Sequence, residues 1–165
     1  MSGMVPSRDV VVVREGAAEI AGAAPTGRLY AESSATGGAL SSQRITLLQG
    51  AAGATPHHHT GSRELFYVVS GAAEMLTGGR VLTAREGDLV VVPPGTVHAF
   101  AAAPAADADL LIIITPGVER FEYFRHLQRI ASGEAPLESI LQVQELYDNH
   151  FDDSPVRQQT LVARL

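Results

Sequence analysis

Two histidines and a glutamate in the middle of the chain have the spacing of metal ligands. The segment Pro56-His57-His58-His59 is followed by Glu64, which opens an apolar run. In an extended chain alternate side chains share a face, so His57 and His59 point the same way and His58 points the opposite way. Glu64 opens the next strand close enough to turn its carboxylate toward the same spot.

A fourth candidate ligand, His98, follows a second segment rich in turn residues. After Gly87, an apolar run over 89–92 leads to a Pro93-Pro94-Gly95 turn, and His98 stands at the start of the next strand. Three imidazoles and one carboxylate inside a barrel suit one divalent transition metal per chain, and Fe, Mn, Ni, Cu, Co or Zn would accept these donors. Four protein ligands in an octahedral shell leave two positions for water, substrate or dioxygen.

The elements that must hold these residues are predicted to be short strands. From Arg44 on, apolar runs follow one another closely, with Gly, Pro, Asp or Ser between them. This spacing favours a sandwich or closed barrel over alternating strands and helices. The predicted strands are 45–48, 65–69, 72–76, 81–83, 89–92, 97–101 and 110–114.

The N-terminal part has a different texture. The β-branched run Val10–Val13 predicts one strand. Residues 31–43 are small and polar without periodicity, which predicts a mobile loop that could hold a frayed edge strand.

The C-terminal part changes to a helical period. Thr115-Pro116 is expected to start a helix whose apolar residues recur every third position and which ends at Ser132-Gly133. A second amphipathic helix is expected from Pro136 to Tyr147. One domain results, with an N-terminal strand and loop (1–43), a barrel core (44–115) and a C-terminal helical extension (116–165).

Composition excludes several chemistries. The 165 residues include no Cys and no Lys, which removes thiolate sites, disulfides, Schiff bases and P-loop phosphate binding. A formal net charge of -6 argues against a nucleic-acid partner. No run approaches the about 20 apolar residues of a membrane span, and the N-terminus lacks the apolar core of a signal peptide. We therefore expect a cytoplasmic protein with no nucleic-acid or membrane partner.

The two histidine segments resemble the two motifs of the cupin family. The first motif is His-x-His, four residues, Glu, six residues and Gly, matched by His57, His59, Glu64 and Gly71. The second is Gly, five residues, Pro-x-Gly, two residues and His, matched by Gly87, Pro93, Gly95 and His98. The resemblance covers roughly residues 44 to 115. It implies an all-β cupin jelly-roll barrel, here with the two C-terminal helices packed outside, and a metal held by His57, His59, Glu64 and His98.

Strand parity extends the expected site beyond the metal ligands. If Glu64 faces inward, so do Phe66 and Val68, and if His98 faces inward, so does Phe100. These three side chains are the candidate substrate-binding residues, although Phe66 and Phe100 could equally be barrel core. An apolar wall with few charges favours an aromatic or enolic small molecule over a sugar phosphate.

The resemblance leaves three functions open. The pattern is similar to quercetinase-type dioxygenases, which implies an enzyme whose metal holds an enolate or phenolate oxygen while Glu64 acts as catalytic base. It is also similar to polyketide cyclases, so a metal-dependent cyclase or isomerase is the alternative. A non-catalytic small-molecule-binding or sensing cupin is the third function.

Other polar residues are expected to lie away from the site. His58 is expected to be exposed or to form a hydrogen bond behind the ligands, and His126 and His150 to be solvated or capping residues. Asp152-Asp153 reads as tail. Because jelly-roll sheets have edges that need cover, and the C-terminal helices carry surplus apolar surface, we expect a homodimer.

Overall fold

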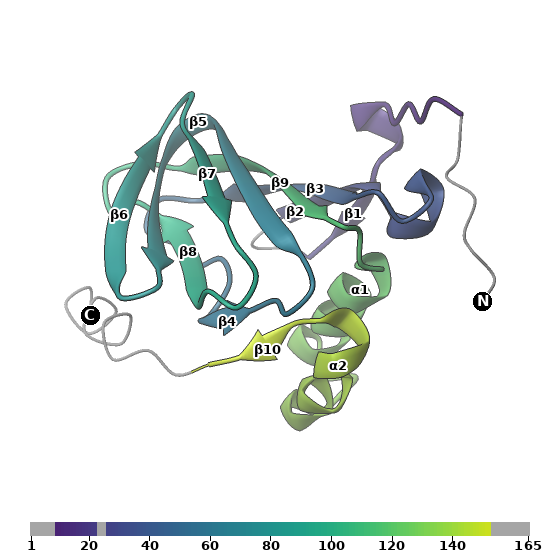
Figure 1. Ribbon diagram of the computed structural model, residues 1–165. Coiled ribbons are helices and arrows are strands. Elements are labelled where there is room, and N and C mark those ends of the chain that lie inside the picture. Colours follow the sequence, from purple (N-terminus) through teal and green to yellow (C-terminus); the bar gives the residue numbers. More distant parts are fainter. Residues whose placement is uncertain (1–8, 23–25, 153–165) are drawn as a thin grey trace.

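Two antiparallel sheets face each other and share one long strand (Figure 1). In the computed structural model, residues 9–22 and 26–152 are described. The first part of β5 (Arg63–Thr77) pairs with β9 (Ala108–Thr115) and β7 (Leu89–Val92). Its second part pairs with β6 (Arg80–Arg85) and β8 (His98–Ala102). The predicted strands 65–69 and 72–76 are therefore one strand that passes from sheet to sheet.

The passage depends on Gly71. The register shifts between Val68 and Ser70, and Gly71 follows with a φ of 77°. A Cβ at Gly71 would lie 1.9 Å from the main-chain oxygen of Asp107. Since L side chains rarely adopt this φ and no Cβ fits here, this position needs glycine.

Outer strands extend both sheets. Beyond β9 the first sheet continues with β3 (Ser41–Leu47), β2 (Thr26–Ala31) and β1 (Glu19–Ala21). Beyond β8 the second sheet continues with the short strands β4 (His57–His58) and β10 (His150–Phe151). The last of these brings the end of the described chain next to the first histidine motif.

The core fills the space between the sheets. Alternate residues of β5 and β9 point inward, as the period of a strand requires. The buried residues of this core include Leu47, Phe66, Val68, Met75, Val92, Phe100, Leu110 and Ile112. The all-β jelly-roll architecture predicted from the sequence is confirmed.

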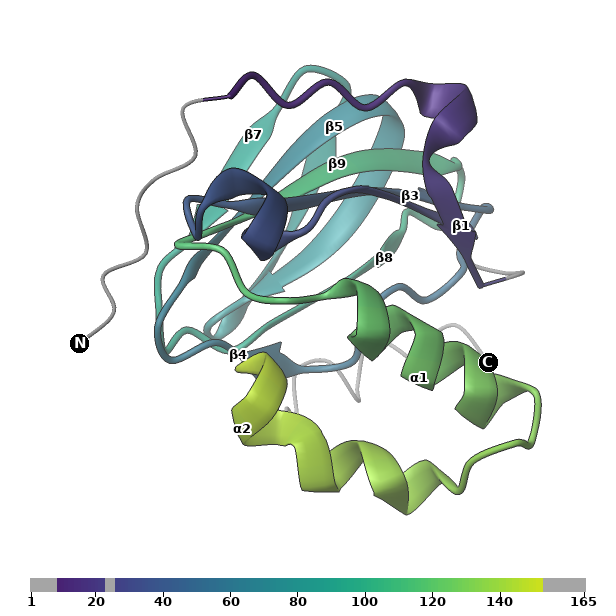
Figure 2. The same cartoon turned by 90° about the vertical axis from the view of Figure 1, so that its right-hand side faces the viewer.

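Helices lie against one end of the barrel, beside β4 (Figure 2). They are α1 (Phe121–Ala131), the 3₁₀ helix η3 (Leu137–Val143) and α2 (Gln144–Tyr147). Tyr123, Ile140 and Tyr147 form their shared buried cluster. No helix within the described ranges is long and apolar enough to cross a membrane.

The expected helix boundaries were partly wrong. Thr115 ends β9, and the first helix begins only at Phe121, although it does end before Ser132. The second expected helix is mostly 3₁₀, and α2 covers only its end. Leu137 and Leu141, placed on its apolar face, are 69% and 54% exposed because α1 contacts only the opposite face of this short segment.

The N-terminal strand prediction was wrong as well. Residues 10–14 form no strand, although η1 (Glu15–Ala17) follows them. Val10 and Val12 are 88% and 62% exposed. Val11 and Val13 instead line a cavity of about 400 Å³ over the outer face of β2, β3 and β9. The stretch 31–43, expected as a loop, contains η2 (Ser33–Thr36) and the start of β3.

Candidate metal centre

The first motif enters the barrel through the short strand β4. His57 pairs with His98 of β8 on one side and with Phe151 of β10 on the other. His59 follows β4, and its main-chain oxygen accepts a 2.7 Å hydrogen bond from the Gly95 N–H. The turn of the second motif is thus bonded to the first motif, which places the imidazoles of both at one point.

Each imidazole is oriented by a main-chain carbonyl. The Nδ1 atoms of His57, His59 and His98 lie 2.8, 2.5 and 2.9 Å from the main-chain oxygens of Thr55, Asp148 and Thr96. A carbonyl oxygen can only accept, so Nδ1 carries the proton in each ring. The three Nε2 atoms therefore face the barrel interior, and each offers a lone pair there when it carries no proton.

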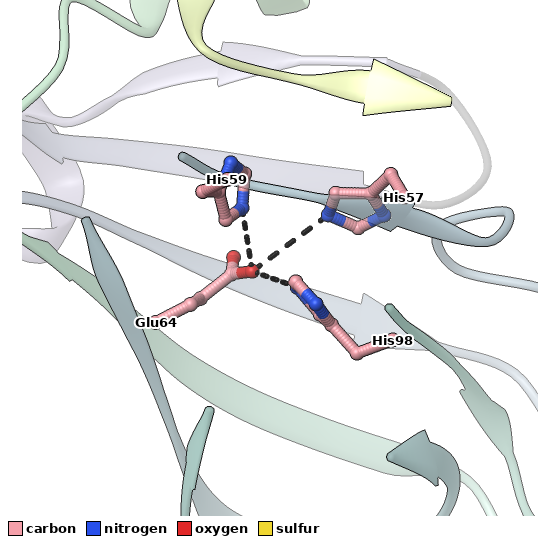
Figure 3. A group of neighbouring side chains, drawn as sticks. All are labelled: His57, His59, Glu64 and His98. Atoms are coloured by element: carbon pink, nitrogen blue, oxygen red, sulfur yellow. Dashed lines mark hydrogen bonds and ion pairs between the residues drawn. The ribbon is translucent and has the colours of Figure 1, made fainter. Parts of the chain in front are cut away.

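Glu64 lies at the point that the three rings face (Figure 3). Its Oε2 is 2.6 Å from Nε2 of His98, 3.0 Å from Nε2 of His59 and 3.7 Å from Nε2 of His57. All four side chains are nearly inaccessible, with exposed fractions of 1 to 3%. Glu64 is the second residue of β5, so the rigid central strand of both sheets holds the carboxylate.

Burial and hydrogen bonding oppose each other at this site. Burial alone would raise the pKa of Glu64, but its contacts with the three imidazoles, two of them hydrogen bonds, lower it well below its usual value. Burial also lowers the pKa of His57. It acts in the same direction on His98, but the hydrogen bond with Glu64 outweighs it and the pKa of His98 is raised.

The donor set fits a divalent transition metal. Three imidazole Nε2 atoms and a carboxylate oxygen converge, and the four ligand atoms lie within 4.8 Å of one another. With neutral rings these atoms are four acceptors in a buried space, and a cation between them satisfies all four. Main-chain carbonyls behind metal-bound imidazoles are the usual means of fixing them. The possible metal site expected from the sequence is thus assembled, and the donors do not select one metal among the candidates.

The remaining histidines lie outside this group. The ring of His58 points away from it, stacks on His150 at 5.1 Å and has its Nδ1 2.5 Å from Asp152 Oδ2. His58 is therefore a hydrogen-bonded residue outside the ligand group. Asp152, which was expected to belong to a tail without a partner, bonds to His58. His126 bonds to Ser139. Asp153 lies outside the described residues.

The predicted apolar wall is present next to the ligands. Phe66 and Val68 are fully buried and Phe100 is 4% exposed, as strand parity predicts. The Phe66 ring lies 6.1 Å from the His98 ring and 5.3 Å from the Phe100 ring, centroid to centroid. The same residues belong to the core cluster, so their burial alone does not assign them to a substrate.

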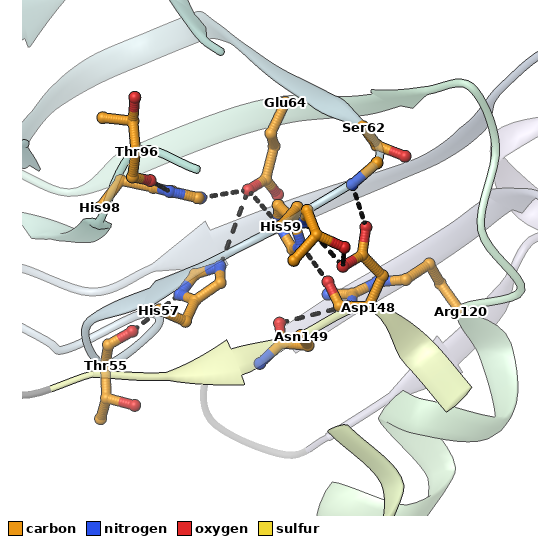
Figure 4. A network of polar contacts seen from close by, with 12 residues as sticks. Thr55, His57, His59, Ser62, Glu64, Thr96, His98, Arg120, Asp148 and Asn149 are labelled. Atoms are coloured by element: carbon orange, nitrogen blue, oxygen red, sulfur yellow. Dashed lines mark hydrogen bonds and ion pairs between the residues drawn. The ribbon is translucent and has the colours of Figure 1, made fainter. Parts of the chain in front are cut away.

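Sequence reasoning missed the polar groups that the C-terminal extension brings to the site (Figure 4). Arg120 and Asn149 are buried, with exposed fractions of 4% and 3%, and are hydrogen-bonded to each other. Asp148 orients His59 through its main-chain oxygen. From the sequence we expected few charges near the metal, and Arg120 was not among them. No sequence motif indicates these residues, because they come close to the ligands only through the packing of the extension on the barrel.

Two facing antiparallel sheets around a buried group of three histidines and a glutamate define a metal-binding type of jelly-roll protein. Residues 43–114 match the family model of the cupin domain. This segment contains all four candidate ligands, and we identify it as a cupin domain. No curated relative matches the chain.

Solved structures with the same fold agree. KdgF from Halomonas sp. is 26% identical, with a TM-score of 0.51 over 59% of this chain and 87% of its own. The polyketide cyclase RemF from Streptomyces resistomycificus is 16% identical, with a TM-score of 0.55 over 66% of this chain and 80% of its own. A predicted oxalate decarboxylase from Thermotoga maritima is 19% identical, with a TM-score of 0.57 over 63% and 97%. The last two likenesses establish the fold.

Proposed function

We propose that the protein is a metal-dependent enzyme that acts on an aromatic or enolic small molecule, and that its reaction is a quercetinase-like dioxygenation. The observation that carries the proposal is the convergence of Glu64 Oε2 with three oriented Nε2 atoms in a buried space. His57, His59, Glu64 and His98 would hold the metal. When bound, a divalent metal would polarise an enol or phenol oxygen of the substrate and promote loss of its proton.

The residues around the ligands supply the rest of the site. The rings of Phe66 and Phe100, with Val68, present an apolar surface beside His98 on which a flat molecule would pack. Burial of such a ligand contributes about 25 cal/mol per Å². Exclusion of water from this space strengthens the interaction of a substrate oxygen with the charges around it.

Glu64 is proposed as the catalytic base. Its carboxylate is the acidic group at the meeting point of the three imidazoles. A Glu64 that loosens from the metal would accept the proton of a substrate hydroxyl.

A metal-dependent cyclase or isomerase is the second candidate. The observation that favours it is the buried carboxylate of Glu64, whose Oε2 lies 2.6 Å from Nε2 of His98. A Glu64 that loosens from the metal would move a proton within a substrate without any use of dioxygen. The two reactions therefore share the site and differ in their need for oxygen.

The test is aerobic incubation of tag-free, metal-loaded protein with a flavonol and with a polyketide-like phenol. Dioxygenation predicts oxygen consumption that matches substrate loss, is absent without metal and falls strongly in Glu64→Gln. Glu86→Gln, an exposed change in a turn, should leave the rate unchanged. Product without oxygen uptake would favour the cyclase or isomerase, and binding without turnover would contradict an enzyme.

A further inference from the structure

Arg120 is a buried cation at the end of the barrel that the helices cover. It directly precedes α1, and its exposed fraction is 4%. The two carboxylate oxygens of Glu32 accept hydrogen bonds from the main-chain N–H groups of Arg120 and Phe121, at 2.6 and 2.8 Å. Glu32 thus fixes the start of the helix, and with it the point from which the Arg120 side chain extends.

The guanidinium of Arg120 is directed toward Asn149, beside His59 (Figure 4). Its Nη1 donates a long hydrogen bond of 3.4 Å to Asn149 Oδ1. The ring of Tyr123 packs 4.4 Å from its Cζ atom, and that of Phe124 5.2 Å. Within the described part of the chain, Arg120 Nε has no hydrogen-bond partner and the guanidinium forms no ion pair with a carboxylate.

The side chain of Asn149 also has a buried donor without an acceptor in the described part of the chain. It is 3% exposed, and among residues 9–22 and 26–152 nothing accepts a hydrogen bond from its Nδ2. Its position is fixed, because its main-chain N–H donates to Gln144 O at 3.0 Å. Buried donors without acceptors are costly, so a pair of them side by side, one of them charged, indicates a place for an acceptor from outside the chain.

This place adjoins the candidate metal centre. Asn149 follows Asp148, whose main-chain oxygen bonds to His59. The nearby carboxylates of Glu32 and Asp148 accept hydrogen bonds from main-chain N–H groups, and neither pairs with the guanidinium. A buried guanidinium without such a partner favours an anion.

We propose that Arg120 and Asn149 bind the carboxylate of a substrate whose second oxygen reaches the metal. The inference rests on the proposed function and narrows its substrate class to an aromatic or enolic carboxylic acid. A guanidinium presents Nε and Nη as a planar fork that matches the two oxygens of a carboxylate. A phosphate dianion needs more positive charge than the one buried arginine described at this place supplies.

The test compares two probes that differ in this group alone. Salicylate and salicylamide share a phenol oxygen for the metal, and salicylate adds the carboxylate. Both are titrated calorimetrically into the zinc-loaded full chain, with metal content measured on every sample. The variants are Arg120→Gln, Arg120→Lys and Asn149→Ala. Arg129→Gln, an exposed change on the same helix, is the matched control.

The wild-type protein should prefer salicylate by about tenfold or more, since truncation of a buried charge pair costs that much. Arg120→Gln should weaken salicylate binding by about that factor and leave salicylamide within about twofold, which a general loss of structure would not do. Arg120→Lys should retain part of the preference for salicylate over salicylamide. Arg129→Gln should retain all of it. If Arg120→Gln does not fold, Asn149→Ala decides by the same comparison.

Two results would overturn the inference and leave the proposed metal site standing. One is a fully metal-loaded wild type that binds both probes with equal affinity. The other is a preference for salicylate that survives in metal-loaded Arg120→Gln. Water on the buried donors would produce the first. Absence of metal from the wild type after loading would instead refute the proposed function and the inference with it.

Discussion

His59 Nδ1 lies 2.5 Å from the main-chain oxygen of Asp148, 89 residues further along the chain. The candidate ligand is thus oriented by the C-terminal extension, outside the segment that carries both cupin motifs. The Asp148 carboxylate accepts hydrogen bonds from Thr60 N, Thr60 Oγ1 and Gly61 N, at 2.7, 2.7 and 2.8 Å. These bonds fasten the extension to the loop between His59 and Glu64.

Asp148→Asn should loosen this connection. Asparagine tolerates the left-handed backbone of this position, where φ is 45°, but it loses the charge that strengthens three hydrogen bonds. We expect the free energy of unfolding to fall by about 1–2 kcal/mol and zinc affinity to fall about tenfold. Urea denaturation and competitive metal titration measure the two effects. Asp88→Asn, which alters a single bond to Arg85 N, should change neither by much.

The Asp148 contribution should also depend on pH. Burial would raise the pKa of Asp148, but hydrogen bonds from Thr60 and Gly61 lower it below its ordinary value of 3.8. A group whose pKa is lower in the folded state stabilises the fold above its unfolded pKa, and the contribution disappears as the pH falls through the folded value. The stability difference between wild type and Asp148→Asn should therefore shrink from pH 6 to pH 3. A difference that grows toward pH 3 would contradict the assignment.

Phe66→Leu should separate substrate packing from metal binding. Leucine keeps most of the buried volume but removes the flat ring beside His98. We expect full metal content, a modest loss of stability and a loss of about 1–3 kcal/mol in the binding of an aromatic ligand. Tyr67→Leu, on the outer face of the same strand, is the control and should leave binding unchanged. Equal binding by both variants would make Phe66 a core residue only.

The protein should be a homodimer in solution. Leu137, Leu141 and Leu146 are 69, 54 and 68% exposed on the outer side of the C-terminal helices. Exposed leucines on adjacent turns favour a subunit contact. Light scattering should give about twice the chain mass of 17.4 kDa, and Leu141→Glu with Leu146→Glu should reduce it to one chain. A wild-type mass of one chain would refute this prediction.

The barrel and its ligand group could be predicted because both depend on local patterns. Strand period places Glu64, Phe66 and Val68 on one face, and the motif spacing brings His98 to them. The surroundings depend on contacts distant in sequence. His59 with Asp148, and Arg120 with Asn149, meet only because the extension folds back and adds β10 to β4. The strand predicted for Val10–Val13 was wrong because β propensity is local, whereas pairing depends on where the rest of the fold places the segment.

Metal stoichiometry tests the central claim most directly. Protein purified without a metal-affinity tag, loaded with zinc and dialysed, should contain one metal per chain by elemental analysis. His59→Ala and His98→Ala should each abolish stoichiometric binding, because each removes one of four convergent donors. His58→Ala and His126→Ala should retain it, because these rings bond to Asp152 and Ser139 instead. Equal loss of metal from His58→Ala and His98→Ala, or full metal in His98→Ala, would contradict the site described here.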